Sequence, residues 1–402
     1  MTRQDACEVL IVGAGITGLA IARELLQHGA QDILIIEKEA GLGFHASGRN
    51  SGVLHAGIYY TPDTLKAKFC IEGNRLMKAY CREKGLTIGQ TGKVIVARDE
   101  SEVPGLYELK QRADASGATS SIIDVNELSN IEPYALTFEK ALYSPETAVF
   151  KPLEILNALA HDLASSRKAG ISYTTQFLRL VNSTTALTSA GPVRFQRLVN
   201  AAGAYADRIA HQFGVAQQYT ILPFKGTYQK LIRDKRFLVR GNIYPVPDLR
   251  NPFLGVHFTH TADDEVFIGP TAIPAFGREN YRLFDGWDAE TPRILWREGL
   301  MFLHDPVFRY SAAEEIKKYS TGFVFRKSSR LLRGLERRDI QRADKTGIRA
   351  QLVNRTTGRL EMDFVVINDG GSLHVLNAVS PAFTSSLAFA RSVAARMVSS
   401  AS

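Results

Sequence analysis

The residues whose types allow chemistry gather in one short stretch, GFHASGRNSGVLHAGIYY, at residues 43–60. Hydrogen-bond donors suited to anionic or carbonyl oxygens come first, at Ser47, Arg49, Asn50 and Ser51. His55 follows them, and a neutral imidazole can accept a proton near pH 7. The stretch therefore predicts a ligand-binding loop with a candidate general base. A polar surface loop is the alternative, although the apolar residues of VLHAGIYY favour burial.

The elements that must position this loop come before it. Residues 8–38, EVLIVGAGITGLAIARELLQHGAQDILIIEK, predict a strand, a glycine-rich turn, a helix and a second buried strand. The turn has the spacing GxGxxG. Gly13 permits the tight turn, Gly15 lets the backbone approach a pyrophosphate, and Gly18 lets the helix pack on the strand. The free N–H groups and positive dipole at the helix N-terminus suit phosphate.

Glu37 closes the second strand, 24 residues after Gly13. A carboxylate at that point binds ribose hydroxyls. Thr17, inside the turn, and Lys38, beside Glu37, complete the expected nucleotide contacts. The acid favours an unphosphorylated ribose, hence FAD or NAD rather than NADP, and the motif by itself does not separate those two. A glycine-rich turn without a ligand is the alternative.

Further turns favour the flavin. The loop at 43–60 would lie along the open end of the sheet, where small residues such as Gly48 and Gly52 leave room for a bulky ring. Residues 197–210, RLVNAAGAYADRIA, predict a strand that ends in a second close-approach turn at Ala202 and Gly203. Residues 372–397 predict a strand, a turn and a final helix, whose N-terminus would receive the flavin pyrimidine oxygens at Ser380, Pro381, Ala382 and Thr384. We therefore expect noncovalent FAD.

Several longer stretches resemble a known superfamily, the FAD oxidoreductases of the D-amino-acid-oxidase type, which includes glycine and sarcosine oxidases and glycerol-3-phosphate dehydrogenases. Within it they are most similar to the L-2-hydroxyglutarate dehydrogenases (oxidases). The stretches are SGRNSGVLHAGIYYTPDTLKAKFC at 47–70, LPFKGTY at 222–228, GNIYPVPD at 241–248, FLGVHFT at 253–259 and LHVLNAVSPAFTSSLA at 373–388. Relatives often have histidine at position 49, where this chain has Arg49. FHAS also resembles a segment of dimethylglycine-type relatives whose histidine binds flavin covalently, which makes a covalent link at His45 the alternative to noncovalent FAD.

The resemblance implies oxidation of L-2-hydroxyglutarate to 2-oxoglutarate by hydride transfer to flavin N5. Such an enzyme needs a base for the hydroxyl proton and cations for two carboxylates. His55 is the expected base, with a structural histidine as the alternative. Arg349 is the expected carboxylate partner, because a guanidinium holds a carboxylate through two hydrogen bonds. The other expected members of the pocket are Lys225 and His374, with Tyr60, Tyr244 and His257 as substrate contacts; for each of them a structural role is the alternative.

The dinucleotide signals are far apart in the sequence, so the FAD-binding domain is expected to be discontinuous. We assign residues 1–88, 148–222 and 346–402 to it. Residues 89–147 and 223–345 would form a substrate-binding domain whose strand-like runs, KVIVA, GTYQKLI and EVFIGP, predict a mixed or antiparallel sheet. The fold class is therefore mixed α/β, and residues 290–342 of the second domain are expected to be helical.

Composition limits the remaining possibilities. The 402 residues have a net charge of +8, yet no basic stripe interleaved with aromatics predicts nucleic-acid binding. An anionic ligand or a membrane surface would explain the charge equally well. Seven lysines and arginines between Arg326 and Arg342 alternate with leucines, which favours a solvated helix packed by its leucines or, alternatively, a helix lying on anionic lipid.

The sequence also predicts a location and electron acceptors. The early first strand leaves no room for a signal peptide, and no apolar run is long enough to span a bilayer, so we expect a cytoplasmic protein, not secreted, with possible peripheral contact on the inner face of the cell membrane. Cys7, Cys70 and Cys81 form no CxxC pair, and no metal site is expected. Electrons would pass to a quinone, a carrier protein or oxygen. Oxidation of glycerol-3-phosphate or of an amine, or a flavoprotein without turnover, are the alternatives.

Overall fold

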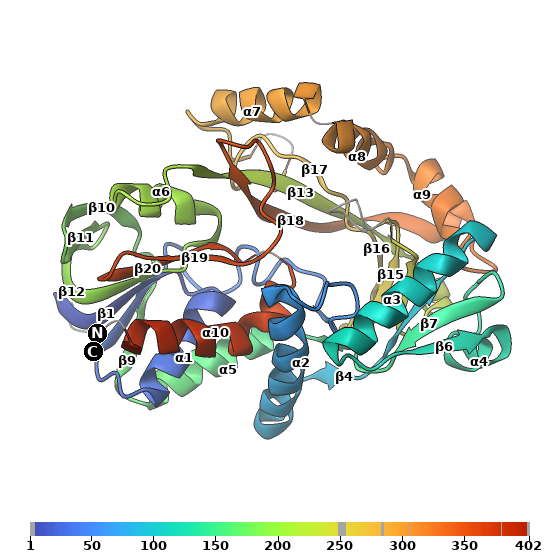
Figure 1. The fold of residues 1–402 in the computed structure, drawn as a ribbon, viewed down its shortest axis with the longest axis horizontal. Helices are drawn as coiled ribbons and strands as arrows, with labels where there is room; N and C mark the ends of the chain where they lie inside the picture. The colour runs from blue at the N-terminus through green and yellow to red at the C-terminus, as the bar shows by residue number, and fades with distance from the viewer. Residues whose placement is uncertain (1–4, 248–254, 283–284, 305, 379, 400–402) are drawn as a thin grey trace.

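The computed structural model describes residues 5–247, 255–282, 285–304, 306–378 and 380–399. The family-like stretches at 241–248 and 253–259 therefore fall partly outside the described residues. Within those ranges the chain forms two large sheets and one small sheet (Figure 1). The chain passes back and forth between the sheets, so neither large sheet comes from one continuous segment.

The first sheet has a parallel centre, as the pattern at residues 8–38 predicts. β1 (Ala6–Val12) lies between β2 (Ile33–Ile36) and β12 (Gly191–Asn200). In parallel with these, β9 (Ala169–Ser172) adds beyond β2 and β20 (Ser372–Asn377) adds beyond β12. The antiparallel additions are β10 (Phe177–Asn182), β11 (Thr185–Thr188) and β19 (Val365–Asn368). The expected mixed α/β class and the discontinuous, Rossmann-like sheet are confirmed.

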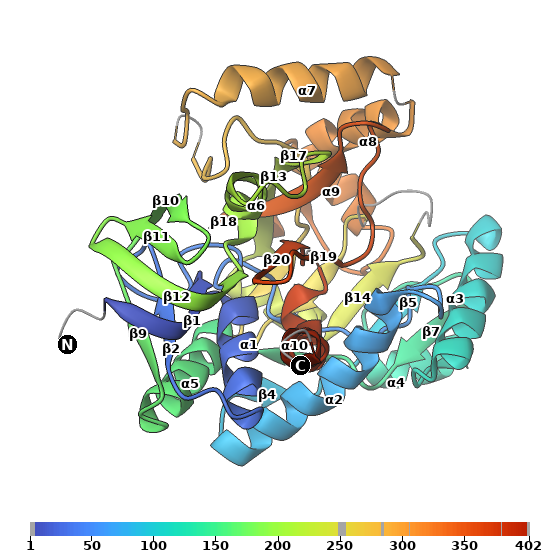
Figure 2. The same cartoon turned by 60° about the vertical axis from the view of Figure 1, so that its left-hand side comes forward.

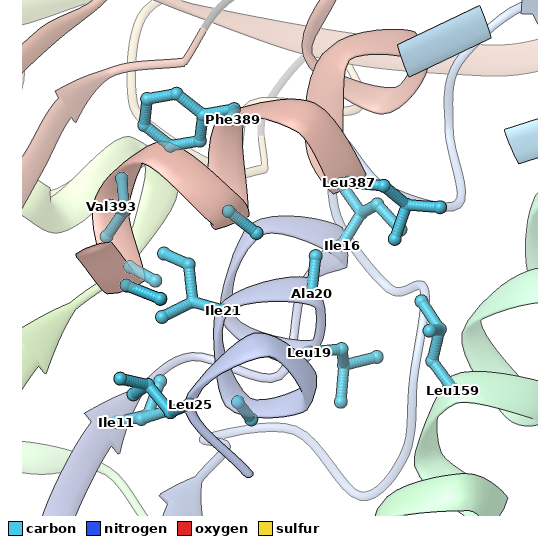
Figure 3. Packing of buried hydrophobic residues seen from close by; sticks show 14 of the residues in the cluster. Ile11, Ile16, Leu19, Ala20, Ile21, Leu25, Leu159, Leu387, Phe389 and Val393 are labelled. Atoms are coloured by element: carbon cyan, nitrogen blue, oxygen red, sulfur yellow. The ribbon is translucent and has the colours of Figure 1, made fainter. Parts of the chain in front are cut away.

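Helices cover the first sheet on both faces, because side chains alternate along its strands. Ile11 of β1 packs under a helical layer, and Figure 3 shows Ile21 of that layer on the side of Val393 and Leu19 on the side of Leu159. Neighbours of Ile11 along β1 face the opposite core, under α6 (Ala206–Gln212). The helices of the layer are α1 (Ile16–Gln27), α2 (Leu65–Lys84), α5 (Pro152–Ser165) and α10 (Ala382–Ser399). The sheet is held in place by apolar side chains buried on both of its faces. The glycine turn lies at the carboxyl ends of the strands and is therefore held in place with them.

The second sheet is antiparallel except for the parallel pair β5–β14. Its strands are β5 (Lys93–Val96), β6 (Ser121–Asp124), β7 (Lys140–Ser144), β13 (Tyr219–Leu231), β14 (Asn242–Pro245), β15 (Phe258–His260), β16 (Val266–Ile268), β17 (Ile273–Pro274) and β18 (Ile340–Asn354). The small sheet contains β3 (Val53–Leu54), β4 (Ile88–Gly89) and β8 (Ala148–Phe150). The strands expected from KVIVA, GTYQKLI and EVFIGP are all present, as β5, part of β13 and β16.

Two long strands join the halves of the molecule. β13 and β18 pair from Tyr219 opposite Asn354 to Leu231 opposite Ile340. The expected domain boundaries, at 222/223 and 345/346, fall inside these strands. We keep the two-domain division as a proposal, and we note that a continuous pair of strands passes through both boundaries.

The remaining helices cover the second sheet and its edges. They are α3 (Val103–Ser116), α4 (Val125–Ile131), α7 (Thr291–His304), α8 (Pro306–Lys317) and α9 (Thr321–Ser328). Short 3-10 turns are η1 (Glu100–Glu102), η2 (Gly203–Tyr205), η3 (Arg233–Leu238) and η4 (Arg337–Asp339). In Figures 1 and 2, α7 and α8 lie at the outer edge of the molecule, beyond β17.

The prediction of a helix over residues 326–342 is wrong. α9 ends at Ser328, and Gly334 has a φ of 76°, which turns the backbone before β18 begins at Ile340. The leucines of this segment do pack into the core of the second sheet, as expected: they are Leu331, Leu332 and Leu335. Arg330 pairs with Asp99, and Arg338 pairs with Glu336. The segment is thus a turn anchored by its leucines, not a helix with a basic face.

The crossing of α2 and α10 supplies a test of the fold. A Cβ atom at Gly73 of α2 would lie 2.2 Å from the carbonyl oxygen of Thr384 in α10. We expect Gly73→Ala to force the helices apart and to lower the free energy of unfolding by about 1–3 kcal/mol. Gly299→Ala on α7 is the matched control, because nothing lies within 4 Å of its Cβ position. There alanine should be neutral or stabilise by up to about 1 kcal/mol. Urea unfolding of both variants measures the difference, and equal small effects would contradict the tight crossing.

Candidate active site

A cavity of about 1080 Å³ lies where the carboxyl ends of the first sheet face the second sheet. One wall consists of the loops after β1, β2 and β12 and the first turn of α10. The other consists of residues from β13, β14 and β18. The predicted site residues that line this cavity are Gly13, Gly15, Thr17, Glu37, Lys38, Ser47, Arg49, Asn50, Ser51, His55, Tyr60, Ala202, Gly203, Tyr244, His257, Arg349, Ser380, Pro381, Ala382 and Thr384. Segments far apart in the sequence therefore meet in one place.

The glycine turn and α1 form one end of the cavity. Gly15 is the N-cap of α1, no acidic side chain lies in the first turn, and the Ile16 N–H donates to Ser47 Oγ at 3.0 Å. The Glu37 carboxylate accepts the Ala14 N–H at 2.9 Å. The positive end of a helix and backbone N–H groups therefore face the cavity beside a carboxylate, as nucleotide phosphates and ribose require.

Three predicted glycines support the loops from behind. A Cβ at Gly18 would lie 2.0 Å from the Gly13 carbonyl oxygen, so α1 can approach the turn only with glycine there. A Cβ at Gly48 would lie equally close to the Gly43 carbonyl oxygen, and one at Gly52 would lie 2.7 Å from that of Phe150. These glycines hold the shape of the site and do not line its surface.

Residue 49 departs from the histidine that relatives often have. The Arg49 guanidinium donates from Nε to the Phe44 carbonyl at 2.6 Å and lies 4.1 Å from the centre of the Tyr281 ring. Asn50 holds the loop by donating to the carbonyls of Ala46 and Ser47. The loop at 43–52 is thus fixed by its own polar side chains, and Arg49 extends from it toward the segment after β17.

A polar network at the nucleotide end was not predicted from the sequence. Lys38 forms ion pairs with Glu39 and with Glu279, the latter at 2.7 Å. His45 contacts Tyr281 Oη at 2.7 Å through Nδ1 and Glu39 Oε1 at 2.8 Å through Nε2. The pKa of Glu279 is low: burial alone would raise it, and the hydrogen bonds from Lys38 and Tyr205 outweigh that effect.

The ring of His45 therefore has both nitrogens engaged, so a covalent flavin link would first have to break one of these contacts. The carboxylates of Glu39 and Glu279 and the His45 ring are close enough to suggest a metal site, but the Lys38 ammonium already occupies that position between the acids. Glu279 and Tyr281 belong to the segment after β17, and their long sequence separation from residues 38–45 explains why no local pattern indicated them.

His55 lies at the other end of the cavity with its backbone fixed on both sides. Its N–H donates to Thr384 Oγ1 at 3.1 Å, and its carbonyl accepts the Asn74 side-chain amide at 2.9 Å. Burial lowers the pKa of His55 well below 6.5, and the nearby Lys93 and His257 lower it further. The imidazole is therefore neutral at pH 7, which is the protonation state that a general base requires.

Three basic side chains belong to this end: Arg349 and Lys66 line the cavity, and Lys93 lies beside His55 without lining it. Burial lowers the pKa of Arg349 to about 10, and burial together with the Arg349 charge lowers the pKa of Lys66 to about 8. Burial also lowers the pKa of Lys93 to about 7. Sequence reasoning singled out Arg349 but missed the two lysines. The signal for Lys93 was a lone charged residue at the start of the apolar strand KVIV.

Aromatic side chains complete this end of the cavity. The Tyr244 ring stacks on the His257 ring with centroids 4.0 Å apart, and His257 Nδ1 contacts the Gly255 carbonyl at 2.7 Å. Burial raises the pKa of Tyr244 to about 12 and lowers that of His257 to about 3, so both rings are neutral at pH 7. The Tyr59 hydroxyl, from the stretch expected to reach the substrate, is buried and has no hydrogen-bond partner among the described residues. It is available to a ligand.

Two predicted pocket residues lie elsewhere. Phe224 and Gly226 of β13 line the cavity, so alternation along the strand places Lys225 on the opposite face, where its ammonium donates to the Arg282 carbonyl at 3.1 Å. His374 of β20 is buried beside Asn200, 3.2 Å from the amide nitrogen, and its ring meets Phe213 edge-on. Neither residue lines the cavity. Their assigned roles in the reaction rest on the resemblance alone.

The site fits FAD by its own geometry. The cavity is continuous from the α1 N-terminus to His55, a length that a dinucleotide with a ring system can fill. The first turn of α10 enters it at Ala382 and Thr384, which places the positive end of a second helix at the far end. The phosphate-binding end and the flavin-binding end that the sequence predicts are therefore both present.

Comparisons with known sequences agree with an FAD site. The family described as FAD dependent oxidoreductase (DAO) matches residues 8–396. The mitochondrial L-2-hydroxyglutarate dehydrogenase of Bos taurus is 38% identical over 411 residues, covering 96% of this chain and 88% of that protein. The L-2-hydroxyglutarate dehydrogenase of an Escherichia coli strain is 32% identical, covering 94% of this chain and 90% of that protein.

Solved structures share the fold. Dithionite-reduced L-alpha-glycerophosphate oxidase from Mycoplasma pneumoniae with FAD bound superposes with a TM-score of 0.76 at 23% identity, covering 98% of this chain and 95% of the other. Glycine oxidase from Geobacillus kaustophilus gives 0.72 at 18% identity, with the same coverage. The family match confirms FAD as the cofactor and shows that the protein is an enzyme. Its sequence, its fold and its cavity together show that the chain belongs to the DAO family of FAD-dependent oxidoreductases.

Proposed function

We propose that the chain oxidises L-2-hydroxyglutarate to 2-oxoglutarate. The names of its relatives, which span most of this chain, support this substrate. The observation that favours it most is the cavity end around His55, which is lined by the buried Lys66 and the partly buried Arg349. A dicarboxylate would neutralise charge that is otherwise costly to bury.

The residues of this end divide the work. Bound FAD supplies the hydride acceptor, flavin N5. His55, neutral and fixed by Thr384 and Asn74, takes the hydroxyl proton as the C2–H bond breaks. Arg349 holds one carboxylate bidentately, with Lys66 beside it, and Tyr59 and Tyr60 donate phenol hydroxyls to the anion. Tyr244 and His257, stacked and uncharged, exclude water from the reacting carbon.

The alternatives predict other chemistry at the same site. A secondary amine substrate that is a cation would be repelled by the positive charges of Arg349 and Lys66. Glycerol-3-phosphate has one anionic group, a phosphate, which the Arg349 fork could also hold, but it has no second acid group for Lys66. A flavoprotein without turnover predicts that no small acid reduces the flavin.

The proposed substrate is tested by anaerobic reduction of the flavin in the purified protein. L-2-hydroxyglutarate should bleach the flavin absorbance with a larger ratio of rate to dissociation constant than lactate, by on the order of 10² or more, because lactate leaves a buried cation unpaired. Glycerol-3-phosphate and sarcosine complete the panel. Equal reduction rates with lactate and L-2-hydroxyglutarate would contradict a site for two carboxylates. Bleaching by glycerol-3-phosphate and by no other compound would show that glycerol-3-phosphate is the substrate instead.

Separate roles for His55 and Arg349 predict separate kinetic effects. His55→Ala removes the base and should lower the flavin-reduction rate at saturating substrate by on the order of 10² to 10⁴. Arg349→Met removes a contact made in both the ground and transition states, so it should chiefly raise KM with a smaller loss in kcat. Flavin content, read from the absorbance ratio, should be unchanged in both. A His55→Ala enzyme that reduces its flavin at the wild-type rate would remove His55 from the mechanism.

We further propose that the reduced enzyme passes electrons to a membrane quinone. No helix among the described residues is long and apolar enough to cross a bilayer. The outer surface of α7 and α8 is apolar and aromatic, with Trp296 68% and Leu303 66% exposed. Exposed Leu295, Phe302 and Tyr310 extend it, and Arg293, Arg309 and Lys317 accompany them. This composition suits the interface of an anionic bilayer. We therefore propose that the membrane contact lies on this α7–α8 surface and not at residues 326–342, where the sequence suggested it.

The α7–α8 surface predicts which substitutions release the protein from membranes. Trp296→Glu with Leu303→Glu should abolish sedimentation with vesicles that contain anionic lipid. Arg337→Glu with Arg338→Glu, in the segment first considered, is the matched control and should reduce sedimentation only slightly at low salt. If only the Arg337→Glu, Arg338→Glu variant fails to sediment with the vesicles, the membrane contact lies at residues 326–342 instead. Stoichiometric hydrogen peroxide, formed as fast as a quinone analogue supports turnover, would exclude the quinone route.

A further inference from the structure

Lys93 is the buried charged group closest to the proposed base. It is 2% exposed at the start of β5, and its Nζ lies 3.4 Å from His55 Nδ1. Its ammonium position lies 4.3 Å from the centre of the Tyr244 ring and 5.1 Å from that of Tyr59. Within the described part of the chain, no carboxylate pairs with it. A lysine so placed is either a charged anchor or a neutral amine.

The contact with His55 decides which form permits the reaction. A charged Lys93 can only donate to Nδ1, which leaves the imidazole proton on Nε2. His55 would then have no lone pair for the substrate hydroxyl. A neutral Lys93 accepts the proton of Nδ1–H, and Nε2 is left with its lone pair.

We propose that Lys93 is a positioning residue and the final acceptor of the substrate hydroxyl proton, which reaches it through the ring of His55. This rests on the proposed function above. The substrate O–H bond breaks as His55 Nε2 takes the proton, and the Nδ1 proton passes to the neutral Lys93 Nζ. The C2–H bond breaks at the same stage, its electron pair leaves as hydride for the flavin, and the C–O bond becomes the carbonyl. The ring of His55 ends neutral, and the new positive charge resides on Lys93.

The groups that face Lys93 favour its neutral form. Cys70 of α2, with a pKa raised to about 12 mainly by burial, is an uncharged thiol. Tyr244 and Tyr59 are uncharged phenols, because burial raises the pKa of both, and His257 is uncharged because burial lowers its pKa. His55 is neutral for the same reason. Among the residues that the structure describes, no anion faces the ammonium to stabilise it, which agrees with a lysine pKa near 7.

The two forms of Lys93 give opposite pH dependences. As a proton acceptor Lys93 must be neutral, so the ratio of the flavin-reduction rate to the substrate dissociation constant should rise with pH through about 7, before it falls as Lys66 loses its charge above about 8. As a charged anchor for a carboxylate it must be protonated, and the same ratio should fall through that pH. Wild-type enzyme with bound FAD and L-2-hydroxyglutarate, followed by anaerobic stopped flow, distinguishes them. A profile that falls through about pH 7 overturns the proposal without any variant.

Two substitutions make the test independent of the profile. Lys93→Met removes the acceptor, and we expect the reduction rate at saturating substrate to fall on the order of 10²-fold, with the rise near pH 7 lost. Lys93→Arg keeps a cation that donates to Nδ1 but cannot accept a proton, so it should be as slow as Lys93→Met. An anchor would tolerate arginine. A Lys93→Arg enzyme with the wild-type rate and profile therefore overturns the relay.

A control variant separates the relay from the general effect of removing a buried lysine. Lys78 of α2 is 4% exposed and pairs with Glu146, outside the cavity. Lys78→Met should keep the wild-type reduction rate and pH profile. Failure of the proposed function is a different result, because the wild-type flavin would then not be reduced by L-2-hydroxyglutarate at all. If L-2-hydroxyglutarate reduces the wild-type flavin and Lys93→Met keeps the wild-type pH profile, His55 remains the proposed base and Lys93 has no part in the proton transfer.

Discussion

The structure depends on the cost of burying positive charge beside an apolar core. Lys66 of α2 and Arg349 of β18 line one end of the cavity, Lys93 of β5 lies beside His55 there, and burial lowers the pKa of each. Placing charge in such a position opposes folding, and an anionic ligand would relieve part of that cost. Ligands that bind only the folded state stabilise it by mass action. The same charges that weaken the empty fold therefore give the site its affinity for a small acid.

Glycine makes that cavity possible at its other end. The turn between β1 and α1 brings backbone N–H groups to the surface only because Gly18 admits the Gly13 carbonyl at a distance that any Cβ would block. The Glu37 carboxylate and Ser47 hydroxyl then accept N–H groups of the turn and hold it in place. The nucleotide end is rigid and polar, whereas the His55 end is aromatic and cationic. One cavity thus provides a polar environment for the nucleotide part of FAD and an aromatic, cationic one for the flavin ring and the substrate.

Local patterns predicted the parts of the molecule whose physics is local. The GxGxxG turn, the second strand ending at Glu37 and the N-terminus of α10 follow from spacing and residue type, and all of them line the cavity. Lys225 was misplaced relative to the cavity because a strand's facing depends on its register with β17 and β18, which a single strand does not reveal. The helix expected at 326–342 failed because the leucine spacing suited a buried turn equally well. Glu279, Tyr281 and Lys93 were missed since their partners are distant in the sequence.

The order in which the cavity is assembled follows from the positions of its walls along the chain. The glycine turn is made well before the first turn of α10, which holds the His55 peptide through Thr384. The long pair β13–β18 also closes only after residue 340 has been made. A growing chain can therefore present the phosphate-binding turn before the ring-binding end, which does not exist until residue 384 has been made. Capture of the whole cofactor must consequently wait for α10, and a chain that stops before it would have half a binding site.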